Sequence, residues 1–253
     1  MYLYGKILIE ELHKIEGIEY IKMAIDKRNV NAIAYYGALI LVNNDNRKNN
    51  NNNYNKINEG ISYLKEAIEK GDSFAMYLYG KFLFKNDNKE EGIKLIKQSA
   101  DIGNSKAMYE YGDFLMSQNN MLDGFEYIKK SADEGYTEAI YKLGVLLIEN
   151  SLTDTKKGDG FKFIREAANK GNVNAMHYSG LTFLNNDKIQ PNEFYKKEAL
   201  RYFKNAADKG KDESIFFYAF LKSRENQSEY DAEEATKYFK ISIENGNVNS
   251  MFE

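Results

Sequence analysis

The chain of 253 residues contains no cysteine, no tryptophan, a single proline and only two histidines. Without cysteine it cannot form disulfides, thiolate metal sites or thiol nucleophiles. With Pro191 as its only proline, helices can run almost without interruption. Apolar runs such as Gly144–Ile148 are far too short to span a bilayer, so no membrane insertion is expected. Because Met1–Ile9 lacks the basic start and cleavage signal of a secretory peptide, we expect a cytoplasmic protein.

An excess of either charge sign is also missing. The 35 basic and 38 acidic residues give a formal net charge of −3. This balance gives no electrostatic footprint for nucleic acid and no polybasic patch for a membrane surface. We therefore expect no nucleic-acid partner, and we expect negligible retention on heparin at low salt.

The sequence does contain an internal repeat. A segment that recurs at a regular spacing is typical of proteins built from stacked structural repeats. Met76–Lys81 repeats Met1–Lys6 without a change. We call this segment helix A. Its other copies, most of which open on a small residue and end on glycine, are Ala32–Gly37, Ala107–Gly112, Ala139–Gly144, Ala175–Gly180 and Ser214–Ala219.

A second segment, helix B, lies between the copies of helix A. Its first copy is Gly17–Ala24, and its apolar residues line one helical face. The later copies start at Gly60, Gly92, Gly124, Gly160, Ala199 and Ala235. Glycine inside a helix costs about 1 kcal/mol relative to alanine, so its recurrence at this place indicates a close approach of two helices.

The spacing separates a fixed joint from a variable loop. From the small residue late in helix B to the glycine of the next helix A there are always 13 residues, as from Ala67 to Gly80. Each joint carries a glycine suited to a left-handed helix cap, except that the first has Arg28, where we expect a poorer cap. All insertions fall between helix A and helix B, along one edge of a stacked array. The longest such loop, 43–57, contains five consecutive asparagines and is expected to be disordered.

This pattern resembles the Sel-1-like repeat family, a relative of the tetratricopeptide repeat. The family unit opens with alanine, continues to Leu-Gly and closes with Ala-Ala-x-x-Gly. Ala139 and Leu143–Gly144 match the opening, and Ala167–Gly171 and Ala206–Gly210 match the closing. The resemblance covers nearly the whole chain, although tyrosine often replaces leucine before the glycine and the shortest period is only 32 residues.

The resemblance implies an all-α, right-handed α/α superhelical solenoid of about seven antiparallel helix pairs. We expect one array over residues 1–253, with a further helix starting at 247–253. The expected repeats are 1–28, 29–71, 72–103, 104–135, 136–171, 172–210 and 211–246. Both ends fall inside a helix A, so we expect a segment of a longer protein or ends that pair with a partner.

The same resemblance implies a scaffold or adaptor that binds a protein or peptide on the concave face formed by helices A. One row of helix A positions is mostly tyrosine and the row four residues later varies, as at Lys81 and Asp113. The tyrosine row has two interpretations, packing between adjacent helices A or a ladder for an extended peptide. His177 in that row is typical of a hydrogen-bonded packing residue. The candidate partner-binding residues are Tyr77, Lys81, Tyr109, Asp113, Tyr141 and His177.

Catalytic patterns are scarce, and we expect no enzyme, no cofactor and no metal. The two histidines lie in different repeats, and no glycine-rich phosphate loop follows a strand. Carboxylate pairs such as Glu90-Glu91 lie near helix N-termini, where negative charge favours the helix dipole. A carboxylate-only hydrolase stays an alternative. So does an architectural or regulatory segment of a longer multidomain protein, for example beside a kinase or in a quality-control complex.

Overall fold

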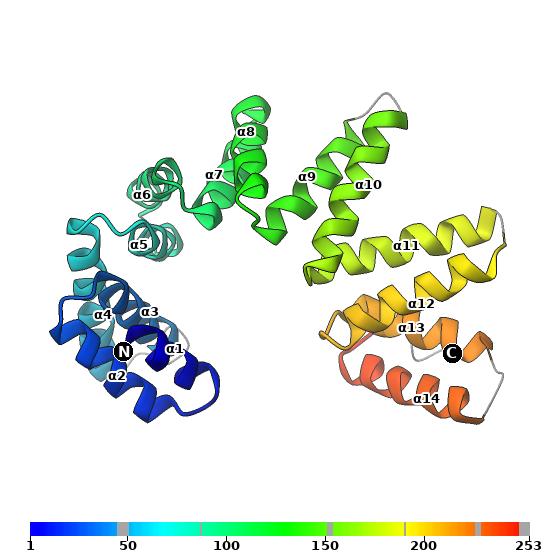
Figure 1. Cartoon of the computed structure of the whole chain (residues 1–253), viewed down its shortest axis with the longest axis horizontal. Coiled ribbons are helices and arrows are strands. Elements are labelled where there is room, and N and C mark those ends of the chain that lie inside the picture. Colours follow the sequence, from blue (N-terminus) through cyan, green and yellow to red (C-terminus); the bar gives the residue numbers. More distant parts are fainter. Residues whose placement is uncertain (45–50, 87, 151–153, 190, 226–228, 248–253) are drawn as a thin grey trace. The chain divides into compact units, whose positions relative to one another are not determined.

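The structure is a computed structural model that describes residues 1–44, 51–86, 88–150, 154–189, 191–225 and 229–247. These residues form fourteen helices, which pack in consecutive pairs, as α11 with α12 in Figure 1. This confirms the expected all-α fold of helix pairs, while the right-handed superhelix stays a prediction. The chain divides into two compact units, residues 1–131 and 132–253, which we describe separately.

The first unit contains four helix pairs, with helix A odd-numbered and helix B even-numbered. From α1 to α6 each helix packs most closely on the other member of its pair, and α2, α4 and α6 each contact the helix A that follows. Helices α7 and α8 approach each other at Gly112 and Gly124. The helices are α1 (Tyr2–Glu10), α2 (Lys14–Asp26), α3 (Val30–Asn44), α4 (Asn51–Glu69), α5 (Ser73–Lys85), α6 (Lys89–Ile102), α7 (Ser105–Ser117) and α8 (Met121–Asp133). The last two residues of α8 fall beyond the division at Ser131.

The second unit contains three helix pairs of the same kind. Its contacts follow the same order, α9 with α10, α10 with α11 and so on to α14. The helices are α9 (Thr137–Glu149), α10 (Asp154–Asn169), α11 (Val173–Ile189), α12 (Glu193–Ala207), α13 (Asp212–Glu225) and α14 (Glu229–Glu244). The seven helices A and seven helices B expected within residues 1–246 are therefore present as helices.

The recurring glycines lie where the two helices of a pair approach most closely. A Cβ added to Gly92 of α6 would lie 2.7 Å from the carbonyl oxygen of Gly80 in α5 and 2.6 Å from the amide nitrogen of Phe84. Both atoms belong to the backbone, so neither can move aside as a side chain could. The close approach predicted from the repeated glycines is confirmed, and the same Gly-to-Gly contact recurs in the other pairs from α1–α2 to α9–α10.

The joint from helix B to helix A has nearly the same geometry in successive repeats. Gly71 and Gly103 adopt the left-handed conformation, at φ +82° and +111°. The residues that follow, Asp72 and Asn104, have φ and ψ of −71° and 112° and of −71° and 111°. Their side chains cap the next helix, since Asp72 Oδ1 accepts from the amide of Ala75 at 2.7 Å and Asn104 does the same one repeat later.

The first joint, at Arg28, differs from the expectation of a poorer cap. Arg28 itself takes the left-handed conformation, with φ +58°. Its amide donates to Ile25 O at 2.7 Å, and Asn29 N donates to Ala24 O at 3.1 Å. Gly71 and Asp72 make the same two bonds at their joint. The hydrogen bonds are thus complete, and the cost of arginine is the strain of a Cβ at positive φ, about 1 kcal/mol.

The segment 43–57, expected to be disordered, is helical where the structure describes it. Residues 43–44 belong to α3 and 51–57 to α4, while 45–50 lie outside the described residues. Ile61 and Leu64 anchor the packed end of α4, and extending an existing helix costs little once it is nucleated. Residues 248–253, where a further helix is expected to start, also lie outside the description.

A pair of aromatic rings joins helix A to helix B in several repeats. One ring belongs to the residue before the helix A glycine, or before Ala219 in the last repeat, and the other to the fourth position of helix B. The rings meet edge to face with centroids 4.8 to 5.1 Å apart, a geometry that favours the aromatic quadrupoles. The pairs are Tyr4–Tyr20, Tyr36–Tyr63, Tyr111–Tyr127 and Tyr218–Tyr238.

Candidate protein-binding surface

The tyrosine row of helix A mainly joins one repeat to the next. Tyr77 is only 7% exposed and belongs to a core cluster with Ile96, Ala100 and Ala107 of the following helices. Its hydroxyl donates to Glu110 Oε1 at 3.3 Å. Burial, followed by the negative charge of Glu110, raises the pKa of Tyr77 above its ordinary 10.0. Tyr77 therefore offers little surface to a partner.

Lys81 lies at the edge of this contact and remains about half exposed. Its Nζ lies 2.5 Å from Glu110 Oε1 and 5.4 Å from the ring centroid of Tyr77. Burial alone would lower the pKa of Lys81, but its bond to Glu110 and the Tyr77 contact outweigh that effect and raise it. One carboxylate from α7 thus holds both a hydroxyl and an ammonium from α5.

Glu110 is a site residue that the sequence interpretation missed. Its signal is a carboxylate 29 residues after Lys81, close to the repeat period, but in the sequence that spacing does not distinguish a partner from a solvated charge. Tyr109 is half-buried and Asp113 is exposed, and both have further contacts within the chain. In the first unit the structure thus brings Tyr77 and Lys81 together through Glu110.

In the second unit the row continues with Tyr141 and His177, both half-buried. Tyr141 meets the ring of Tyr178 edge to face at 6.4 Å. His177 Nδ1 lies 2.7 Å from the hydroxyl oxygen of Ser214, a fully buried residue in the first turn of α13. The imidazole also packs against Phe203 and Phe217, with centroids 5.7 and 5.9 Å away. His177 therefore lies in a packing contact between repeats.

The environment of His177 predicts a pH-dependent stability. Burial, followed by the charge of Lys211, lowers the pKa of His177 below its ordinary 6.5, with Glu213 opposing. The unfolded chain then binds this proton at a higher pH than the folded chain. The stability from neutral His177 is present above pH 6.5 and is lost as the pH falls from there through the folded-state pKa.

Urea midpoints between about pH 8 and about pH 5 test this expectation. His177→Gln should flatten the decline that begins near pH 6.5, whereas the exposed His13→Gln variant should keep it. Parallel curves for the wild type and His177→Gln would contradict the assignment.

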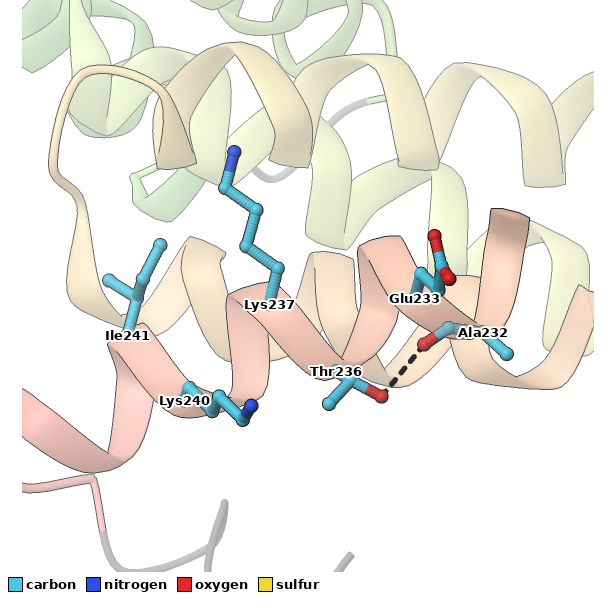
Figure 2. Close-up of a pocket in the computed structure, with 6 residues that line it drawn as sticks. All are labelled: Ala232, Glu233, Thr236, Lys237, Lys240 and Ile241. Atoms are coloured by element: carbon cyan, nitrogen blue, oxygen red, sulfur yellow. Dashed lines mark hydrogen bonds between the residues drawn. The ribbon is translucent and has the colours of Figure 1, made fainter. Parts of the chain in front are cut away.

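A shallow hollow on the last helix is a second surface feature. Figure 2 shows its lining, in which every side chain comes from α14. Thr236 is turned to its own helix, because its hydroxyl donates to Ala232 O at 2.8 Å. The lining residues are Ala232, Glu233, Thr236, Lys237, Lys240 and Ile241. With walls from one helix alone, the hollow does not enclose a small molecule.

The described residues also bear on membrane and metal binding. None of the helices in the described ranges is both long and apolar enough to cross a membrane. Within those same ranges, histidine, aspartate and glutamate do not gather in groups of three or more that could hold a metal ion.

The comparisons with known proteins agree with the repeat pattern. The family model described as the Sel1 repeat matches residues 74–104, 105–136, 137–172, 175–211 and 213–247, more than half of the chain. A search of curated proteins finds no match.

Solved structures with the same fold are distant in sequence. A Sel1 repeat protein from Oxalobacter formigenes is 15% identical, with 96% of this chain and 99% of that chain covered and a TM-score of 0.74. The protective antigen c5321 of uropathogenic Escherichia coli, which displays an SLR fold, is 18% identical, with coverages of 89% and 48% and a TM-score of 0.63. The immunity protein PA5088 of Pseudomonas aeruginosa is 18% identical, with coverages of 83% and 79% and a TM-score of 0.55. At these identities the likeness shows the fold alone.

Proposed function

The chain belongs to the Sel1 repeat family, and we propose that it binds another protein or a peptide on the surface of its helices A. Repeat folds of this kind are typical of protein-binding scaffolds, because stacked helices present an extended surface. The immunity protein and the protective antigen among the similar structures support this class of role without identifying the partner of this chain.

The proposal depends on a contrast between two rows of side chains on the helices A. One row is nearly the same in every repeat, and the other differs from repeat to repeat. The tyrosine row makes contacts between repeats, as Tyr77 does with Glu110. Four residues further along helix A, the side chains are partly or fully exposed and differ from repeat to repeat. In the first unit this row is Lys6, Ala38, Lys81 and Asp113, and in the second it is Val145, Leu181 and Phe220. The helix pairs and their tyrosine contacts repeat, while the exposed side chains of this row change. Such variation allows a protein to select one partner among many.

We infer that specificity resides in this variable row and not in the tyrosines. The first unit supplies charged side chains that can pair with a polar segment, and the second supplies half-buried apolar ones. A charged stretch of a partner fits the row of the first unit, and an apolar stretch fits the row of the second unit. Lys81 already forms an ion pair with Glu110. A carboxylate of the partner would therefore bind the Lys81 ammonium together with Glu110.

The test compares two double variants with the same change of charge. Lys81→Ala with Asp113→Ala removes one cation and one anion from the helix A row. Glu66→Ala with Lys70→Ala removes an exposed ion pair of 2.5 Å from helix B of the second repeat. After the intact chain has captured its partner and mass spectrometry has identified it, we expect the first double variant to lower affinity at least about tenfold. The second should change affinity less than about twofold.

Equal affinity of wild type and the Lys81/Asp113 variant would show that this row does not bind the partner. Equal losses in both double variants would mean that general stability, and not the helix A surface, governs binding. Circular dichroism of each variant distinguishes a lost contact from lost structure.

A further inference from the structure

The sixth repeat, residues 172–210, lacks one of the aromatic rings that join helix A to helix B elsewhere. Ser179 of α11 occupies the place of Tyr111 or Tyr218, while the helix B partner, Tyr202 of α12, is retained and is 4% exposed. Phe183 stacks on Tyr202 with centroids 5.7 Å apart and an interplanar angle of 13°. This stacking replaces the edge-to-face pair only in part, because the place of the missing ring is not filled.

A cavity of about 440 Å³ lies at this place, between α10, α11 and α12. These three helices lie next to one another in Figure 1, drawn from green to yellow, and all belong to the second unit. Phe161, Phe183 and Tyr202 supply aromatic wall, and Phe161 is 40% exposed at the mouth. The volume falls in the range of small-ligand pockets, about 300–1,000 Å³, and exceeds what a single aromatic side chain needs.

Ser179 places a hydroxyl in the wall of this cavity. The residue is 7% exposed, and within the described part of the chain its hydroxyl has no hydrogen-bond partner. The other buried serines behave differently, since the hydroxyls of Ser99 and Ser131 donate to backbone carbonyls at 2.6 and 2.7 Å. A buried hydroxyl without a partner costs free energy, and a ligand that supplies the partner recovers it.

Among the described residues that line the cavity, the charged ones are cationic. They are Lys162 and Arg165 of α10, and none of the described lining residues is acidic. Lys162 pairs with Asp159 at 2.8 Å. Arg165 is exposed and makes no ion pair with any of the described residues. The guanidinium is thus available to a carboxylate, which it binds with two parallel hydrogen bonds where the geometry allows.

The cavity opens on a different side of α11 from the proposed binding row. Ser179, Thr182 and Phe183 recur at the three- and four-residue spacing of one helical face. Leu181, the α11 member of that row, lies two residues after Ser179, about 200° around the helix. Ligands of the cavity and of the helix A row therefore do not compete for the same side chains.

We propose that this cavity binds the tyrosine side chain of a second protein, in a segment where an acidic residue neighbours the tyrosine. The incoming ring takes the place of the missing one beside Tyr202. It enters hydroxyl first, so that the phenol reaches the unpartnered hydroxyl of Ser179. The neighbouring carboxylate then meets Arg165 at the mouth. This inference goes beyond the proposed helix A surface and stands or falls independently of it.

Binding is measured by ligand-observed NMR with small probes. The first probe is 4-hydroxyphenylacetate, which joins a phenol to a carboxylate. Tyramine has the same ring with an ammonium group, and phenylacetate lacks the hydroxyl, so each removes one of the two recognised groups. We expect 4-hydroxyphenylacetate to bind at least about threefold more tightly than either. An acetylated and amidated Gly-Glu-Tyr-Glu-Gly peptide should bind more tightly again, since it carries two carboxylates.

Variants test the location of the site. Ser179→Tyr restores the ring that other repeats carry, and it should abolish binding of the peptide while raising the melting temperature by a few degrees. If Ser179→Tyr does not fold, Ser179→Leu, the residue type of Leu143 in the preceding repeat, takes its place in the test. Arg165→Gln should weaken the peptide about three- to tenfold. Thr236→Tyr on the exposed face of α14 is the control for an added tyrosine and should leave binding unchanged.

Unchanged peptide binding in a folded Ser179 variant would overturn the proposal. So would equal binding of tyramine and 4-hydroxyphenylacetate, since Arg165 would then have no role. Binding of the free acid without binding of the peptide would overturn the protein source of the ring. The Lys81/Asp113 double variant should bind the peptide like the wild type, which separates this result from a failure of the helix A surface.

Discussion

Replacing Gly160 with alanine should lower the free energy of unfolding by about 2–3 kcal/mol, a large effect for the addition of one methyl group. A Cβ on Gly160 would lie 2.7 Å from the carbonyl oxygen of Gly144 and 2.6 Å from Cγ1 of Ile148. The side chain of Ile148 can rotate, but the carbonyl belongs to the backbone of α9. Helices α9 and α10 must therefore move apart, which loosens contacts along the whole pair.

The matched control lies two residues away in the same helix. Gly158 also belongs to α10, but a Cβ built there meets no atom within 4 Å. Gly158→Ala should therefore raise the free energy of unfolding by about 0.5–1 kcal/mol, because alanine is the better helix former.

Urea denaturation followed by circular dichroism measures both variants. Opposite shifts of the two midpoints are expected. A midpoint that also rises for Gly160→Ala would show that helix propensity outweighs the Gly-to-Gly contact. Gly144→Ala should repeat the loss from the other helix, since its Cβ would lie 2.8 Å from Gly160 O.

Phe203→Ala should destabilise the second unit by about 3–5 kcal/mol. Phe203 is fully buried and stacks on Phe217 with centroids 5.0 Å apart. Its ring also occupies the space next to Gly180, where an added Cβ would lie 2.7 to 2.9 Å from three ring atoms. In the preceding repeats, the corresponding glycine of helix A instead has the backbone of helix B among its nearest contacts.

A double-mutant cycle makes this prediction specific to the Phe203 contact. Gly180→Ala alone should destabilise the wild type, but in the Phe203→Ala background the ring is gone and the added methyl group should be neutral or stabilising. We expect a coupling energy of at least about 1 kcal/mol from urea denaturation. Phe194→Ala, on the same helix but 58% exposed, should cost less than about 1 kcal/mol. Additive effects of Gly180→Ala and Phe203→Ala would contradict the contact.

The helix pairs could be predicted because each depends on a local signal that the sequence repeats. Glycine inside helix B has few explanations other than close approach, and the Gly80–Gly92 contact confirms it. The joint follows in the same way from glycine at a constant distance from helix A. Arg28 shows the limit of this reasoning, because the neighbouring structure holds an arginine in the left-handed conformation that glycine adopts elsewhere.

The site could be predicted only in part, because its contacts cross between repeats. The sequence indicates that Tyr77 belongs to a regular row, but whether that row is buried depends on the next helix A. Glu110 and Ser214, which bond to Tyr77 and His177, were not predicted, since a partner 33 or 37 residues away has no local pattern. The cavity beside Ser179 was missed for a related reason. A serine in place of tyrosine shows that a ring is missing, but not whether Phe183 and Tyr202 close the space.

The uniform joint between helix B and helix A has a consequence for how such a chain changes length. Residues 72–103 form one repeat of 32 residues, bounded by Gly71-Asp72 and Gly103-Asn104. Both glycines are left-handed, and Asp72 and Asn104 have nearly equal dihedral angles. An in-frame loss or duplication of these 32 codons would bring Gly71 before Asn104, or Gly103 before Asp72, without creating a new kind of turn. Selection can thus lengthen or shorten the molecule in whole repeats, while the loops between helix A and helix B absorb changes of any other length.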